Sequence, residues 1–122
     1  REQEDVRHAV WIRSVSSDRK VDVVMARDFR ELLKRDYVIL DGAMGTMLQA
    51  KGMKMGALPE LLNIENPEWI IDVHKQYINA GADVIYSNTF GANSYKLKNC
   101  NYSVSEIIEA GIKNAKKAFE YR

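Results

Sequence analysis

Apolar residues gather along the chain in two arrangements: short continuous runs, and sets that repeat at helical spacing. Two continuous runs, "YVIL" at residues 37–40 and "ADVIYS" at residues 82–87, are typical of strands buried on both faces of a parallel sheet. Polar residues and glycine follow each run. We therefore expect two parallel strands, each ending in a loop.

Two longer segments have the apolar spacing of amphipathic helices. In "NPEWIIDVHKQYINAG", Asn66 stands at the N-cap position, Pro67 in the first turn and Gly81 just past the end. Further along, Ser103 and Glu106 have the spacing of a capping box. The apolar face of this last helix comprises Val104, Ile107, Ile108, Ile112, Ala115 and Phe119.

The segment between the first strand and the first long helix has weaker signals. "TMLQAKG" predicts a short helix that ends at Gly52, and "MKMGALPELLNIEN" predicts a long connection interrupted by Gly56 and Pro59. The element order is β-loop-α-β-loop-α, which is typical of an alternating α/β architecture. Two parallel strands do not form a stable sheet without further strands and helices beside them.

The N-terminal residues differ in character from the rest. Two short β-prone runs flank the turn-like "SSDR" and predict a hairpin within residues 1–24. Met25 then opens a segment with the features of a translation start, followed by a short helix with Asp28 as its N-cap. We expect residues 1–24 to be an atypical leader, either a hairpin or disordered, and residues 25–122 to form the domain.

Composition and charge narrow the class of protein. The 122 residues can bury one modest core, so a single domain is expected. The formal net charge of +1 without a basic stripe gives no support for a nucleic-acid or acidic membrane partner. One cysteine, Cys100, cannot form an internal disulfide, and no apolar run approaches the ~20 residues that span a bilayer. We expect a cytoplasmic protein.

Polar side chains follow both predicted strands, where parallel α/β folds bind their ligands. Asp41 and Gly42 follow the first strand, and the stretch Ser87, Asn88, Thr89 and Phe90 follows the second. If the two strands are neighbours, a carboxylate, an amide, two hydroxyls and an aromatic ring converge on one mouth. Such a set suits a small zwitterionic ligand, because the carboxylate can bind an ammonium group and the amides a carboxylate.

Plainer interpretations compete with this one. Asp-Gly is a common turn dipeptide, so Asp41 is equally expected to bond its own backbone. Asn93 and Ser94 are expected to cap the next helix. His74 is expected to be a partly buried structural histidine, and Cys100 a lone thiol without metal-ligand spacing. A nucleotide site is set aside, because neither G-x-G-x-x-G nor Gly-Lys-Ser/Thr is present.

Taken in order, "ILDGAMGTMLQ", "PELLN" and "NPEWIIDVHKQYINAGADVIYSNTFGANSYKL" resemble the start of the homocysteine S-methyltransferase family. The nearest branch is the homocysteine-binding barrel of the cobalamin-dependent methionine synthases. The resemblance covers roughly residues 28–120. It implies a (β/α)8 barrel that holds homocysteine at its C-terminal mouth, where zinc on three cysteines ionises the thiol and methyl transfer gives methionine.

The resemblance also implies roles for residues of this chain. Asp41 and Gly42 match the family's "DG" motif, and residues 87–90 match its "TNTF" motif, with Ser87 in place of the more usual Thr. Asp41 would bind the homocysteine amino group. The backbone around Gly42 and the loop from Ser87 to Phe90 would hold the carboxylate and the chain.

One departure limits what the resemblance implies. The family's zinc cysteines lie on later strands and Cys100 matches none of them, so we expect no metal ligand and no catalytic residue in this chain. The expectation is the N-terminal portion of a barrel, truncated after about two βα units and inactive alone. Its partners would be the remainder of the barrel or a cobalamin-binding module, with methylcobalamin, S-methylmethionine or betaine as methyl donor. Two alternatives are a non-catalytic amino-acid-binding or assembly module, and an unrelated small α/β domain.

Overall fold

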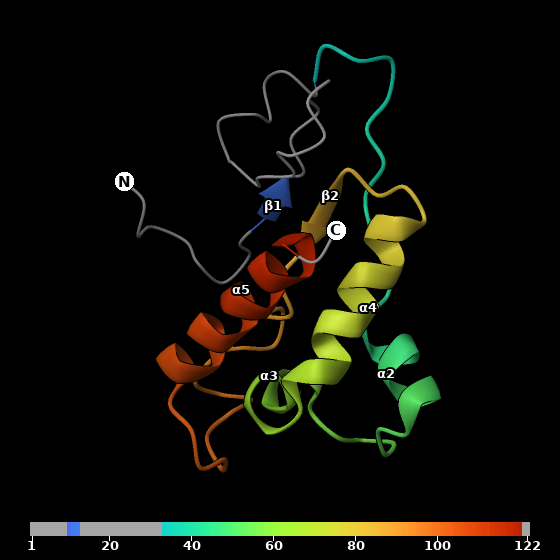
Figure 1. Cartoon of the computed structure of the whole chain (residues 1–122). Helices are drawn as coiled ribbons and strands as arrows, with labels where there is room; N and C mark the ends of the chain where they lie inside the picture. The colour runs from blue at the N-terminus through green and yellow to red at the C-terminus, as the bar shows by residue number, and fades with distance from the viewer. Residues whose placement is uncertain (1–9, 13–32, 121–122) are drawn as a thin grey trace.

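The computed structural model describes residues 10–12 and 33–120, and this part of the chain is mostly helical (Figure 1). Its elements are β1 (Val10–Ile12), α2 (Gly45–Lys51), η3 (Pro59–Leu61, a 3-10 helix), α3 (Leu62–Glu65), α4 (Pro67–Asn79), β2 (Val84–Tyr86) and α5 (Val104–Glu120). No helix in these described ranges is long and apolar enough to cross a membrane.

The two long helices form where their end signals predict them. α4 begins at Pro67 and is followed by Gly81, which has a φ of 115° that suits glycine beyond a helix end. Asn66 occupies the N-cap position as predicted, and its side chain makes no capping hydrogen bond there. At the start of α5, Ser103 N–H donates to Glu106 Oε1 at 2.9 Å and Glu106 N–H donates to Ser103 Oγ at 3.1 Å. The predicted capping box is confirmed.

The connection between α2 and α4 contains more structure than predicted. α2 ends before Gly52, whose φ of 123° terminates the helix as expected. The following residues were expected to be a loop, yet Pro59–Leu61 and Leu62–Glu65 form η3 and α3. Leu58 and Leu61 pack against the buried Ile107 cluster, and this tertiary contact favours helical turns that the local sequence signals alone did not predict.

The predicted strand at residues 37–40 is wrong as stated. This segment has only one bridge, in which Leu40 pairs with Val84 in the parallel direction. Tyr37, Ile39 and Leu40 are 67%, 44% and 52% exposed rather than buried. An apolar strand is buried only when other layers cover it, and none of the apolar clusters formed by the described residues includes this segment.

β2 forms as predicted and is bonded on both sides. Asp41 N–H donates to Val84 O at 3.0 Å, while Val84 N–H donates to Ile39 O at 3.2 Å. On the opposite edge, β1 pairs with β2 in the antiparallel direction. Residues 10–12, part of the first run of the predicted N-terminal hairpin, therefore pair with β2; the second run and the Asp28 helix cap lie outside the described residues.

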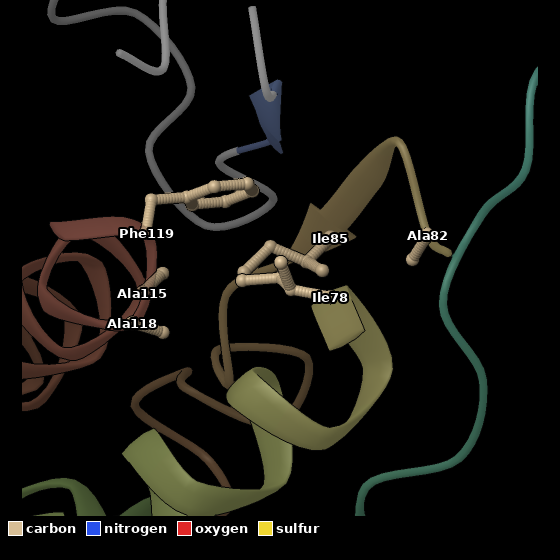
Figure 2. Packing of buried hydrophobic residues seen from close by; sticks show 6 residues of the cluster. All are labelled: Ile78, Ala82, Ile85, Ala115, Ala118 and Phe119. Atoms are coloured by element: carbon tan, nitrogen blue, oxygen red, sulfur yellow. The ribbon is translucent and has the colours of Figure 1, made fainter. Parts of the chain in front are cut away.

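The apolar core lies between the two long helices and β2. In Figure 2, Ile78 of α4, Ile85 of β2 and the α5 side chains Ala115 and Phe119 point toward one another. A second cluster joins the first half of α5 to Ala92 and Leu97, and a third joins α2 to α4. The helices thus hold β2 and the loop that follows it in a fixed place, which is where the candidate site lies.

Candidate functional site

Asp41 joins the two polar segments that follow residues 37–40 and β2. The Tyr86 N–H group donates to Asp41 Oδ2 at 3.2 Å, so the two chain segments meet at their carboxyl ends. Asp41 is half-buried, and the resulting desolvation raises the pKa of its carboxyl above 3.8 even though the Tyr86 bond acts in the opposite direction. A half-exposed carboxylate that is costly to charge is well suited to take a cationic ligand group.

Gly42 is held close to α4 by a hydrogen bond of the neighbouring residue. The Tyr77 hydroxyl donates to Ala43 O at 2.7 Å, and a Cβ at Gly42 would lie 3.0 Å from the Tyr77 hydroxyl oxygen. Only glycine leaves this approach unstrained. The sequence analysis did not identify this contact of Tyr77 with the Asp-Gly turn.

The loop after β2 turns its hydroxyl groups inward and its aromatic ring outward. Ser87 and Thr89 are buried, and their hydroxyl oxygens lie 3.0 Å apart. Phe90 is 78% exposed, with the Lys96 ammonium group 5.9 Å from the centre of its ring. Asn93 Oδ1 accepts from Lys96 N–H at 2.9 Å, so Asn93 caps a turn and not, as had been expected, the start of a helix.

Asn88 is buried, and its amide group makes hydrogen bonds within the protein. Its Nδ2 donates to Pro59 O and to Asn63 Oδ1, each at 2.9 Å. A carboxylate lies close by: Glu60 Oε2 accepts from Gly91 N–H at 2.8 Å. The sequence analysis did not identify Glu60 and Asn63 as partners of this loop. Their signal in the sequence was the "PELLN" motif, where they stand one helical turn apart.

The geometry therefore brings Asp41 beside Tyr86 and continues directly into the loop from Ser87 to Phe90. At the carboxyl end of β2 and the bridged segment of residues 37–40, together called the strand pair, the Asp41 carboxylate is half-exposed and the Phe90 ring is exposed, whereas Ser87, Asn88 and Thr89 are buried.

The described residues do not fit a resident metal ion. Across residues 10–12 and 33–120, no group of three His, Cys, Asp or Glu side chains could hold one. The thiol of Cys100 instead donates to Tyr102 O at 3.2 Å. His74 is wholly buried in α4, and this desolvation lowers its pKa to about 4. Its ring nitrogens have no hydrogen-bond partner among the residues that the structure describes.

Comparison with known proteins identifies the family to which the chain belongs. The family model for homocysteine S-methyltransferase matches residues 38–122. The chain belongs to this family, as its motifs predicted.

Two methionine synthases are among its relatives, one from Mycobacterium tuberculosis and one from Mycobacterium leprae. Each is 36% identical over 87 residues, covering 66% of this chain. The chain spans about 7% of the length of these curated relatives.

Proposed function

We propose that this chain supplies part of the homocysteine site of a homocysteine S-methyltransferase, as the N-terminal portion of a (β/α)8 barrel. The observation that carries the proposal is the contact between Asp41 and Tyr86, which joins the two polar strand ends at one mouth. Family membership supplies the substrate class. The parallel bridge between Leu40 and Val84 is the pairing that the first two strands of such a barrel require.

In this proposal each end of the amino acid has its own partner. The Asp41 carboxylate binds the homocysteine ammonium group, a charge-assisted bond that offsets the cost of keeping this half-buried acid ionised. The backbone around Gly42 and the loop from Ser87 to Phe90 hold the carboxylate and the side chain of the substrate. The residues proposed to bind substrate are Asp41, Gly42, Ser87, Asn88, Thr89 and Phe90.

The reaction of the family is methyl transfer to the homocysteine sulfur, which gives methionine. Zinc, when bound, would supply an ionised thiol, but the described residues offer no set of ligands for it, and we derive no step through it. What these residues do is bind and orient the amino acid. The resemblance to the cobalamin-dependent branch favours methylcobalamin as the methyl donor, with a cobalamin-binding module or further barrel strands as partners.

A second candidate is a non-catalytic binding or assembly module built on a partial barrel. The observation that favours it is the exposure of Tyr37, Ile39, Leu40 and Tyr86 beside the strand pair, because such apolar surface commonly marks an interface. A defined oligomer of the 122-residue chain that binds no amino acid would support this candidate over the first.

The proposal is tested by calorimetric titration of the purified chain with L-homocysteine. We expect saturable binding that weakens about tenfold or more in Asp41→Asn, because a charge-assisted hydrogen bond contributes about 1.5–3 kcal/mol. Asp36→Asn is the matched control, since it removes an exposed carboxylate outside the site. 4-Mercaptobutanoate lacks the amino group, so it should bind the parent chain and Asp41→Asn equally. Equal homocysteine affinity in the two proteins would contradict the role of Asp41.

A further inference from the structure

The short segment from Pro59 to Asn63 contacts the proposed substrate loop at two points. We propose that Glu60 and Asn63 are positioning residues that hold the loop from Ser87 to Gly91 in its ligand-binding shape. This inference rests on the proposed function, because it assigns a role in homocysteine binding to residues that do not line the site. Glu60 is 6% exposed and Asn63 is 2% exposed, so both act through the loop.

The first point of contact is a reciprocal pair of amides. Asn63 Nδ2 donates to Asn88 O at 2.8 Å, and Asn88 Nδ2 donates to Asn63 Oδ1 at 2.9 Å. The second hydrogen of Asn63 Nδ2 goes to Ile107 O in the first turn of α5, at 3.1 Å. Asn63 therefore ties both the backbone and the side chain of Asn88 to a helix whose apolar face is buried in the core.

The second point of contact is a carboxylate on the main chain of the loop. Glu60 Oε2 accepts from Gly91 N–H at 2.8 Å, and a Cβ at Gly91 would lie 2.9 Å from that same oxygen. A side chain at position 91 would thus displace the carboxylate. A buried carboxylate that accepts a backbone N–H group makes one of the stronger hydrogen bonds in proteins.

Helix α5 also contacts Asn63 and the loop from Ser87 to Gly91. Asn114 Nδ2 donates to Asn63 O at 3.1 Å. A Cβ at Gly111 would lie 2.8 Å from Asn63 Nδ2 and 3.0 Å from Thr89 Cγ2, so the helix backbone approaches the loop closely. The loop cannot shift without breaking buried hydrogen bonds, each of which is costly to leave unmade.

This fixed loop has a consequence for binding. Ser87, Thr89 and Phe90 stand within the tied segment, and a site that is already in its binding shape loses less conformational entropy when the ligand arrives. Loosening the tie should therefore weaken homocysteine binding in a chain that is still folded. A residue that served stability alone would change the melting temperature and leave the dissociation constant of the folded chain as it was.

The test compares Glu60→Ala, Glu60→Asp and Glu60→Gln in the full chain, with homocysteine titrations well below each melting temperature. We expect Glu60→Ala and Glu60→Asp to raise the dissociation constant about tenfold, because neither side chain reaches Gly91 N–H. Glu60→Gln keeps an acceptor oxygen and should remain within about threefold of the parent. Glu60→Asp keeps the test decisive if Glu60→Ala does not fold. Ile78→Val, in the core beside Phe119, should lower the melting temperature alone.

Amide hydrogen exchange at Gly91 provides the independent readout, and it should accelerate in Glu60→Ala and Glu60→Asp. Unchanged homocysteine affinity in these folded variants would overturn the positioning role and leave the proposed function standing. Absence of homocysteine binding by the parent chain would instead overturn the proposed function, and the inference with it.

Discussion

The segment of residues 37–40 runs parallel to β2, and one aspartate lies at each end of this strand pair in a very different environment. At the amino end, Asp83 is 5% exposed, accepts from Ile39 N–H at 3.0 Å and pairs with the Arg35 guanidinium group at 3.1 Å. At the carboxyl end, Asp41 is half-buried and accepts from Tyr86 N–H. Within the described residues Asp83 has a cationic partner and Asp41 has none.

This difference separates a structural acid from a candidate functional one. Asp83 fixes the register of residues 35–39 against β2 with its hydrogen bonds. Asp41 pays a desolvation cost that raises its pKa, and a cationic ligand would relieve that cost. Sites with uncompensated polar groups are commonly where a fold gives up stability for function.

The largest expected effect is on the stability of the helices, on which both ends of the strand pair depend. Folded His74 has a pKa of about 4 against 6.5 as its ordinary value, so the unfolded chain binds the proton first as the pH falls. The free energy of unfolding should be steady above about pH 7, decline as the pH falls through 6.5, and have lost about 3 kcal/mol by about pH 4.

Urea unfolding at a series of pH values measures this decline. His74→Leu should remove its contribution, because an apolar side chain of similar size has no proton to gain. The same pH dependence in both proteins would contradict the assignment to His74. In the His74→Leu variant, Asp41 and Asp83 can also be compared in mild acid without unfolding of the helices.

The next largest effect is expected from a substitution at the amino end of the strand pair. Asp83→Ala leaves the Ile39 N–H group without its acceptor and should lower the free energy of unfolding by about 2 kcal/mol. Asp41→Ala is the matched change at the other end and should cost less than about 0.5 kcal/mol, because its ionised form is already disfavoured. Chemical denaturation measures both. A larger loss in Asp41→Ala than in Asp83→Ala would reverse the comparison.

The smallest effect tests the turn beside Asp41. Gly42→Ala places a methyl group 3.0 Å from the Tyr77 hydroxyl oxygen and should cost about 1 kcal/mol as the bond to Ala43 is displaced. Gly45→Ala meets nothing within 4 Å at the start of α2, so it should be neutral or stabilise by a few tenths of a kcal/mol. Thermal melting of the pair measures the difference. Equal shifts would show that Tyr77 does not brace the turn.

The sequence predicted those parts of the fold whose causes are local. Pro67, Gly81 and the Ser103–Glu106 capping box mark helix ends within a few residues, and both long helices begin where they indicate. The burial expected for residues 37–40 failed because burial depends on what covers a segment, and no local pattern encodes that.

The same distinction applies to the site. From the rule that parallel strands place their carboxyl ends together, Asp41 was expected beside the end of β2 only if the two segments were neighbours, and the parallel bridge between Leu40 and Val84 makes them neighbours. The bonds from Asn63 to Asn88 and from Gly91 to Glu60 span 25 and 31 residues of sequence. Neither periodicity nor turn chemistry connects residues so far apart. The binding roles of residues 41–42 and 87–90 stay predictions.

The central claim is that the carboxyl end of the strand pair, and not the amino end, holds homocysteine. It is tested most directly by titrating the ¹⁵N-labelled chain with L-homocysteine and following each backbone amide by NMR. The account predicts saturable shifts at Gly42 and from Ser87 to Gly91, with Ile39 and Asp83 unmoved. Shifts confined to the amino end, or no saturable shift in a folded chain, would contradict it.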